Sequence, residues 1–188
     1  MTCIVAIKEG NTIYMGADSA GTNSYFEKRI RTDPKIYHVE GYMFGFTTSF
    51  RMGQLLGYAF VPPDRDPRIP LEKFMATSFI DAVRKCLKDG GFAQKQNEEE
   101  QGGQFLVAYE GRLFQVFADY QVAESVDGYE SCGCGGDLAM GSLHTTGEHT
   151  TMYPKERLKV ALEAAEKFSA GVQGPFIYGT QIIETKEA

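Results

Sequence analysis

The sequence predicts an α+β fold in which antiparallel sheets are covered by pairs of helices. Strand-like and helix-like segments come in blocks: two hairpins, two helices, a third hairpin, two further helices and a closing strand. Such blocks favour antiparallel sheets, whereas strictly alternating strands and helices favour a parallel sheet. The 188-residue chain has no Pro/Ser-rich linker, so we expect a single domain over residues 1–188.

Each predicted hairpin consists of two β-rich runs joined by a short turn that contains glycine. The first strand begins directly after residue 2, and strand pairing should hold that residue in place instead of leaving it to fray. A closing strand is expected within residues 174–185. The hairpins are residues 3–8 with 12–17, the segment 35–49 turning at Glu40-Gly41, and the segment 104–119 turning at Glu110-Gly111.

Four segments have the apolar spacing or the end signals of helices. In residues 71–91, apolar side chains recur every three to four positions until Gly90-Gly91 ends the pattern. The polar segment 92–103 is expected to be a loop. The other helices are predicted at 49–60, within 132–143 after a glycine-rich turn, and at 154–171, where a proline stands at the start.

Composition and charge argue against several classes of function. Lys and Arg number 19 against 25 Asp and Glu, and a net charge of −6 disfavours nucleic acid or an anionic membrane as the main partner. The N-terminus lacks the features of a secretory signal, and no apolar run approaches the ~20 residues that span a bilayer. We therefore expect a soluble, cytoplasmic protein whose four cysteines are free thiols. Neither these nor the three histidines have zinc-like spacing, so no metal site is predicted.

Three side chains near the first predicted hairpin could carry catalytic chemistry. Removal of Met1, which aminopeptidases perform when the next residue is small, would leave Thr2 with a hydroxyl and a free α-amino group. Asp18 ends the strand that pairs with the first one, so antiparallel pairing should bring it close to Thr2. Lys35 precedes the next strand, and a lysine beside a hydroxyl stabilises its alkoxide. Taken alone, Asp18 also fits a polar turn, Lys35 fits the surface, and threonine is common at position 2.

Two later segments are candidates for supporting roles. The glycine-rich stretch Cys132–Asp137 could hold an anion on its backbone N–H groups. It lacks the Lys-Ser/Thr of a phosphate-binding loop and the setting of a dinucleotide site, so a tight strand-to-helix turn is the simpler interpretation. Glu166 and Ser169 lie one turn apart and share one face of the last predicted helix, where solvated polar residues are also common.

Taken together, three motifs resemble the proteasome β-subunit family, and within it the bacterial HslV-type peptidase. They are TCIVAI with IYMGADSAGT in residues 2–22, KIYHVEGYMFGF at 35–46, and CGCGGDLAMGSL at 132–143. Their order and spacing agree with the family over nearly the whole chain. The resemblance implies that Thr2, exposed by removal of Met1, attacks a peptide carbonyl with its own α-amino group as base.

Position by position, the resemblance implies four further catalytic residues. Asp18 matches the acid that orients the terminus, and Lys35 matches the charge that activates the hydroxyl. Ser169 and Glu166 match the late Ser and Asp that brace the nucleophile, with Glu166 standing where the family has Asp.

The resemblance also implies where substrate binds. Thr22 matches the residue whose backbone aligns substrate as an added strand. The glycine whose N–H points at the oxyanion falls at Thr48 or Ser49, next to Thr47 in the expected pocket. The turn Gly133-Cys134-Gly135 matches the one that supports the terminal amine, and its cysteine stands where the family has serine.

The fold and assembly expected from this resemblance are a four-layer αββα sandwich of two antiparallel sheets, with subunits stacked into closed rings. The implied function is that of a threonine endopeptidase to which a ring-shaped ATPase feeds unfolded protein. No cofactor is implied, because Thr2 supplies both nucleophile and base.

Two other interpretations stay open. The same fold could serve as a catalytically silent ring subunit that retains Met1, which Cys134 and the pair Thr48-Ser49 would suit because they depart from the family's residues. Alternatively, an amidohydrolase of small substrates could use Cys3 as its terminal nucleophile if Thr2 were also removed.

Overall fold

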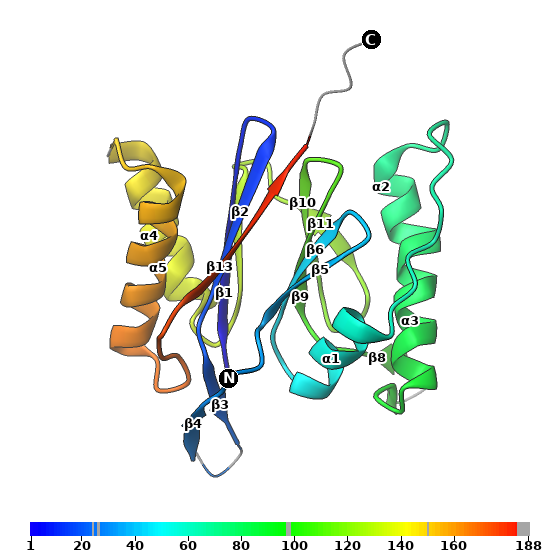
Figure 1. Ribbon diagram of the computed structural model, residues 1–188, viewed down its shortest axis with the longest axis horizontal. Coiled ribbons are helices and arrows are strands. Elements are labelled where there is room, and N and C mark those ends of the chain that lie inside the picture. Colours follow the sequence, from blue (N-terminus) through cyan, green and yellow to red (C-terminus); the bar gives the residue numbers. More distant parts are fainter. Residues whose placement is uncertain (24, 26, 97–98, 150, 184–188) are drawn as a thin grey trace.

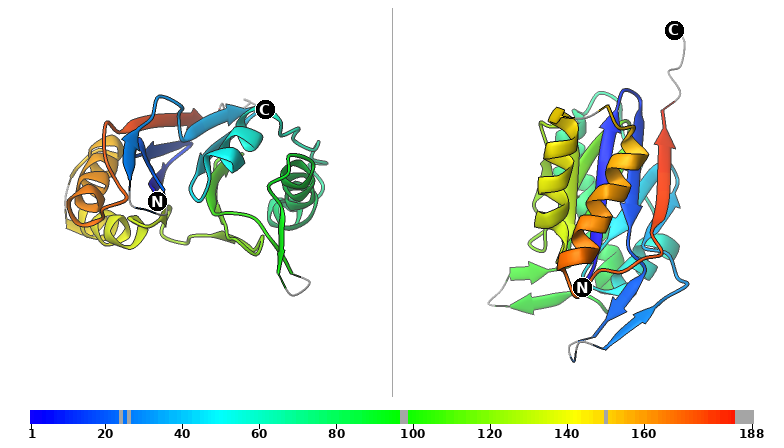
Figure 2. Two further views of the ribbon diagram at one scale, coloured as in Figure 1. Left: turned by 90° about the horizontal axis from the view of Figure 1, so that it is seen from below. Right: turned by 90° about the vertical axis from the view of Figure 1, so that its left-hand side faces the viewer.

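Two antiparallel sheets lie face to face and are enclosed by helices on both outer sides (Figure 1). The computed structural model describes residues 1–188 except 24, 26, 97–98, 150 and 184–188, and it leaves the side chains of 94–96 undescribed. The view from below shows the succession of helices, sheet, sheet and helices edge-on (Figure 2). The predicted four-layer αββα sandwich is therefore confirmed.

The first sheet contains the beginning of the chain in one of its central strands. Its strand order is β12-β1-β2-β13, and every pair is antiparallel. The first predicted hairpin is β1 with β2, in which Ile4 lies opposite Ala17. The strands are β1 (Cys3–Glu9), β2 (Thr12–Ala17), β12 (Tyr129–Gly133) and β13 (Ile177–Ile182).

The second sheet contains the other two predicted hairpins. Its strand order is β11-β10-β9-β6-β5, again antiparallel throughout. The turns Glu40-Gly41 and Glu110-Gly111 each place two consecutive residues at positive φ, as a two-residue type I′ hairpin requires. The strands are β5 (Ile36–Val39), β6 (Tyr42–Phe46), β9 (Phe105–Tyr109), β10 (Arg112–Val116) and β11 (Val122–Glu124).

Each sheet is covered on its outer face by one group of helices (Figures 1 and 2). The helices α4 (Gly136–His149) and α5 (Pro154–Phe168) cover the first sheet. In the second group, the helix predicted at 71–91 is present but has a π-helical middle. No helix in the described part of the chain is long and apolar enough to cross a membrane. The second group comprises α1 (Phe50–Tyr58), α2 (Leu71–Phe74), the π-helical segment η1 (Met75–Phe79) and α3 (Ile80–Asp89).

Three apolar layers fill the three interfaces of the sandwich. One lies between the second sheet and its helices and is rich in aromatic side chains such as Phe44. The layer between the two sheets includes Ile4, while the layer under α4 and α5 includes Cys3, Val5 and Leu162. Alternate residues of β1 thus point to opposite layers, as the two-residue period of a strand requires. By the same alternation, Thr2, the residue before β1, faces the same side of the sheet as Ile4.

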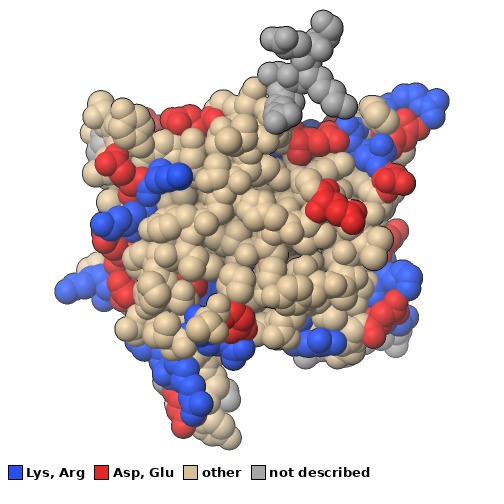
Figure 3. Space-filling model, viewed as in Figure 1, with Lys and Arg blue, Asp and Glu red and all other residues tan. Residues whose placement is uncertain are grey.

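The edge strands β13 and β5 contact each other along one face of the molecule. Most of this face carries no charged side chain, and Lys, Arg, Asp and Glu gather along its flanks (Figure 3). Large apolar residues are exposed on its elements: Tyr178 and Ile182 on β13 are 44% and 70% exposed. An uncharged surface with open strand edges is suited to contact with another chain.

A short hairpin projects from the end of the sandwich at which the chain begins (Figure 1). It consists of β3 (Ala20–Thr22) and β4 (Lys28–Ile30), with Thr22 opposite Lys28. The sequence pattern does not predict this pair, because its strands are three residues long and partly polar. Its place beside the N-terminus makes it a wall of the candidate site described below.

A second short strand pair contradicts the prediction of a loop at 92–103. There β7 (Gln94–Gln96) pairs with β8 (Glu99–Gln101). An ion pair of 2.8 Å between Arg84 of α3 and Glu100 of β8 ties this pair to the outer helix. These strands consist of polar residues with low strand propensity, so the sequence pattern did not indicate them. In the folded chain, tertiary contacts override that propensity.

Leu162 tests the packing of α5 on the first sheet. Its side chain is 0% exposed, so we expect Leu162→Ala to lower the free energy of unfolding by about 2–5 kcal/mol through lost burial and a residual cavity. Urea unfolding followed by circular dichroism measures this loss. Val126→Ala, at a position that is 99% exposed, should change stability by less than about 0.5 kcal/mol. Equal effects of the two variants would contradict the assigned core.

Candidate active site

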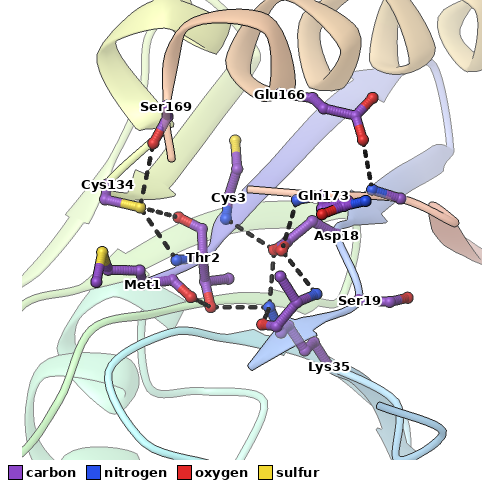
Figure 4. Close-up of polar contacts among 12 residues, drawn as sticks. Met1, Thr2, Cys3, Asp18, Ser19, Lys35, Cys134, Glu166, Ser169 and Gln173 are labelled. Atoms are coloured by element: carbon purple, nitrogen blue, oxygen red, sulfur yellow. Dashed lines mark hydrogen bonds and ion pairs between the residues drawn. The ribbon is translucent and has the colours of Figure 1, made fainter. Parts of the chain in front are cut away.

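Thr2 immediately precedes β1 and is 5% exposed. Its neighbour Cys3 is paired into the sheet and accepts a hydrogen bond from the Asp18 N–H on its carbonyl (3.3 Å). The Thr2 hydroxyl donates to the Met1 carbonyl (2.6 Å) and accepts from Lys35 Nζ (2.9 Å), as Figure 4 shows. The nucleophile predicted from the sequence is thus fixed by the sheet and touches a cation.

Lys35 and Asp18 form a buried ion pair beside Thr2 (Figure 4). Their side chains are 1% and 0% exposed, and 2.8 Å separates Nζ from Oδ1. Nζ also donates to the Ala20 carbonyl (2.6 Å), so its three N–H bonds are directed to a carboxylate, a carbonyl and the Thr2 hydroxyl. The hairpin brings Asp18 to the start of β1, as expected from antiparallel pairing, while Lys35 arrives from the second sheet just before Ile36 begins β5.

Backbone donors surround the Asp18 carboxylate. Oδ1 accepts from the Cys3 N–H (3.0 Å), and Oδ2 accepts from the Ala20 N–H (3.0 Å) and the Gln173 N–H (3.3 Å). These three backbone donors hold the carboxylate in one orientation beside Lys35. Burial lowers the pKa of Lys35 below its ordinary 10.5, and the charge of Asp18 opposes that shift. Because every N–H of Lys35 has an acceptor and one acceptor is a carboxylate, the geometry fits the ammonium form.

The glycine-rich turn lies against the backbone of Thr2. Gly133 has a φ of +98°, and a Cβ there would lie 2.2 Å from the Thr2 carbonyl oxygen, so glycine is required at this position. The Gly135 N–H donates to the same oxygen (3.3 Å). The Thr2 N–H donates to the Cys134 sulfur (3.2 Å). The turn is therefore adjacent to Thr2, and its supporting role in catalysis stays a prediction.

Ser169 and Glu166, the two residues predicted to brace the nucleophile, have different hydrogen-bond partners. Ser169 follows α5, and its hydroxyl donates to Cys134 Sγ (3.5 Å), so it contacts the turn. Glu166 accepts from the Gly174 N–H (2.8 Å), and Figure 4 shows its carboxylate directed to that loop. In the described structure no hydrogen bond joins either side chain to Thr2 itself. A direct bracing contact is thus not formed, and Glu166 instead holds the segment that follows α5.

A pocket of about 450 Å³ opens beside Thr2, between β3 and the segment that connects β6 to α1. All four predicted substrate-binding residues line it, together with residues that the sequence analysis did not single out. The Arg31 guanidinium lies 3.9 Å from the centroid of the Phe50 ring and forms an ion pair with Asp33. The lining includes Thr22, Thr47, Thr48, Ser49, Arg31 and Phe50.

Thr48 adopts a backbone conformation that usually belongs to glycine. Its φ is +61°, in a region that β-branched residues rarely enter. The Thr48 hydroxyl accepts from the Gln104 N–H (3.1 Å), and the Thr47 hydroxyl donates to the Gln104 carbonyl (2.9 Å). The Ser49 N–H donates to the Thr47 carbonyl (2.6 Å), whereas the Thr48 N–H has no acceptor among the described residues. Of the two candidates for an oxyanion donor, Thr48 offers the free N–H.

Cys3 is fully buried in the layer beneath α4 and α5. Burial, assisted by the charge of Asp18, raises the pKa of the Cys3 thiol to about 12. Neighbouring residues of a strand face opposite sides of a sheet, so Cys3 faces the helices while Thr2 faces Lys35 and the second sheet. This placement disfavours the interpretation as a cysteine-dependent amidohydrolase, because the Cys3 thiol faces the helices and does not line the pocket beside Thr2.

The contacts that are made through the main chain could not be predicted from the sequence. Ala20, Gln104 and Gln173 contribute peptide N–H or C=O groups, which every residue type offers equally, so their side chains give no signal. Only their proximity to Asp18, Thr48 and the closing strand in the folded chain identifies them. Among the described residues, no group of three or more His, Cys, Asp or Glu side chains is arranged to hold a metal ion.

The Asp18 carboxylate can be tested as the counter-ion of Lys35. We expect Asp18→Asn to lower the free energy of unfolding by about 3–5 kcal/mol, because it leaves a buried ammonium ion without a countercharge. Chemical denaturation measures the loss. Asp33→Asn removes one charge from the partly exposed pair with Arg31 and should cost less than about 1 kcal/mol. A similar small loss in both variants would show that Lys35 does not depend on Asp18.

The comparisons with known proteins show similarity in structure and not in sequence. No protein-family model matches the chain, and no curated protein has a matching sequence. BPH from Thiobacillus denitrificans, solved in complex with epoxomicin, is 17% identical with a TM-score of 0.82, covering 98% of this chain and 100% of that one.

Two further solved structures share the architecture. HslV from Trypanosoma brucei is 12% identical with a TM-score of 0.68, covering 97% of this chain and 100% of that one. Anbu, the ancestral beta-subunit from Yersinia bercovieri, is 12% identical with a TM-score of 0.66, covering 96% of this chain and 82% of that one. These structural similarities extend over nearly the whole chain, and at such low sequence identity they establish the fold alone. This chain has the proteasome-like, N-terminal-nucleophile hydrolase fold that BPH, HslV and Anbu share.

Proposed function

We propose that this chain is a threonine endopeptidase whose nucleophile is Thr2 after removal of Met1. The observation that carries the proposal is the 2.9 Å hydrogen bond from Lys35 Nζ to Thr2 Oγ1 at the edge of a pocket. A buried ammonium ion in contact with a hydroxyl favours its alkoxide. The ion pair with Asp18 keeps that ammonium in place.

The reaction starts once Thr2 has a free α-amino group. While Met1 is attached, the nitrogen of Thr2 belongs to an amide and cannot act as a base. After its removal, the amine accepts the hydroxyl proton as Oγ1 attacks the substrate carbonyl carbon. The proton then passes to the leaving amine, and water hydrolyses the resulting ester on Thr2. The N–H of Thr48 is the candidate donor to the oxyanion.

We propose that substrate binds as an extended strand along the free edge of β3. Among the described residues, β3 pairs with β4 only, and Thr22 of β3 lines the pocket. Hydrogen bonds between main chains accept many sequences, which suits the degradation of unfolded protein. The Thr22 hydroxyl oxygen is buried without a partner in the described structure, so a polar group of a bound peptide would satisfy it.

The same proposal includes assembly into stacked rings that enclose the sites, with a ring-shaped ATPase as a possible source of unfolded substrate. The uncharged face around β13 and β5 supports burial against further copies of the chain (Figure 3). The exposed Tyr178 and Ile182 on that face would be covered in such an assembly.

A catalytically silent ring subunit that retains Met1 is the second candidate function. Two features favour it: the pair Thr48-Ser49 where the resembled family often has glycine, and a sulfur at Cys134 where it has a hydroxyl. The intact mass of the purified chain separates the two candidates, because a subunit that keeps Met1 has no free amine at Thr2.

The Thr2→Ala variant tests the nucleophile. We expect hydrolysis of small fluorogenic peptides to fall by roughly 10³-fold or more, since both the attacking oxygen and the ester intermediate are lost. The native mass of the assembly should not change. Thr145→Ala, at an exposed threonine of α4, is the matched control and should keep full activity. Undiminished turnover in Thr2→Ala would refute the assignment.

Epoxomicin offers a direct readout of the same residue. The compound is bound in the BPH structure, and we expect it to add its mass to this chain at Thr2 and to abolish peptide hydrolysis. The chain that retains Met1 should stay unmodified, because its terminal amine and hydroxyl are no longer on one residue. Modification elsewhere in the chain would count against Thr2.

The buried Lys35 predicts an alkaline limit to activity. Its pKa is lowered by burial from the ordinary 10.5, so the ammonium loses its proton at a lower pH than a surface lysine does. We expect kcat/KM to fall as pH rises, with a midpoint below 10.5, because the neutral amine no longer stabilises the Thr2 alkoxide. Steady-state kinetics measure this limb, with circular dichroism as the control for unfolding. A rate that stays constant up to that pH would exclude this role.

A further inference from the structure

The sulfur of Cys134 is the polar atom nearest to the nitrogen of Thr2 in the described contacts. It accepts the Thr2 N–H at 3.2 Å and the Ser169 hydroxyl at 3.5 Å. Its own S–H points to the Thr2 carbonyl, with 3.5 Å between the heavy atoms. The side chain is also exposed. The sulfur is therefore placed between two donors and remains open to reagents.

A thiol in this position differs from a hydroxyl in its acidity, which matters for a neighbouring amine. Free thiols and α-amino groups ordinarily titrate within about one pH unit of each other, whereas a serine hydroxyl does not titrate in this range. Two hydrogen-bond donors, the Thr2 N–H and the Ser169 hydroxyl, are directed at this one sulfur. Cys134 also lies just before the N-terminus of α4, where a negative charge is favoured.

We propose that, in the chain that begins at Thr2, the Cys134 thiol and the Thr2 α-amino group share a proton as a thiolate–ammonium pair. The S–H bond breaks with its electron pair left on sulfur, and the lone pair of the Thr2 nitrogen forms the new N–H bond. No other reactant is needed. Cys134 is then a positioning residue that stores a proton next to the base. The inference rests on the proposed function only in requiring a free amine at Thr2.

The charged and titratable groups near the sulfur are Cys3 on β1, Lys35 before β5 and Asp18, which is paired with Lys35. Glu166 on α5 instead faces the loop at Gly174.

A chain that keeps Met1 carries an α-ammonium group on Met1, whose side chain lies with the Cys134 sulfur against Gly171. The matched control is therefore the chain that begins at Thr2 with its α-amino group acetylated, which lacks both the ammonium and the Met1 side chain.

Alkylation by iodoacetamide tests the pair without any peptidase assay, since only the thiolate reacts. The rate at Cys134 is measured against pH by peptide mass spectrometry, in the chain that begins at Thr2 and in the same chain with its α-amino group acetylated. We expect the midpoint to lie lower by about one pH unit or more when the ammonium is present. Superimposable curves would overturn the proposal. The half-buried Cys86 of α3 is the internal control, and its curve should not move.

Activity supplies the second measurement. If the thiolate holds the amine as an ammonium ion, the rising limb of kcat/KM has its midpoint at higher pH in the wild type than in Cys134→Ser, because the neighbouring negative charge stabilises the protonated form of the base. Equal midpoints in active enzymes would refute the shared proton and leave the peptidase assignment intact. Activity that survives Thr2→Ala would instead refute the peptidase assignment, while the alkylation curves would still decide the inference.

Discussion

The buried ion pair between Lys35 and Asp18 is the interaction on which the rest of the site depends. Removing two charges from water costs several kcal/mol per ion, and their attraction offsets that cost only when the remaining donors and acceptors are satisfied. Here the carboxylate accepts three backbone N–H groups and the ammonium donates to a carbonyl and to Thr2. Segments from both sheets must therefore be correctly packed before this pair can form, which couples the site to the fold.

The two-residue period of β1 provides the second constraint. Ile4 faces the other sheet and Cys3 faces the helices, so Thr2 must face the other sheet, from which Lys35 comes. A shift of one residue in the pairing of β1 would exchange these faces and bury the wrong hydroxyl or thiol. The close contact of Gly133 with the Thr2 carbonyl, which a Cβ would block, helps to exclude such a shift.

Local patterns in the sequence were sufficient for part of this arrangement. Alternating apolar residues and glycine turns predicted the three hairpins, and the geometry of the first one placed Asp18 beside Thr2. Lys35 could be associated with Thr2 only through resemblance, because its position depends on how the two sheets pack. The peptide groups of Gln104 and Gln173, the strand pair at 94–101 and the actual partner of Glu166 left no local signal, since tertiary packing alone determines them.

The two departures from the resembled family act on the site in different ways. Thr48 has a positive φ of 61°, at a cost of roughly 1–2 kcal/mol for a residue with a Cβ. Its hydroxyl recovers part of that cost by accepting from Gln104, and no described residue accepts its N–H, which could then meet an oxyanion. Strain that is held by such contacts is typical of functional positions. Cys134 keeps the contact with the Thr2 nitrogen but offers a thiol, which is ordinarily far more acidic than a hydroxyl. Under the proposed function, the backbone change leaves the oxyanion donor in place, whereas the side-chain change alters the partner of the base.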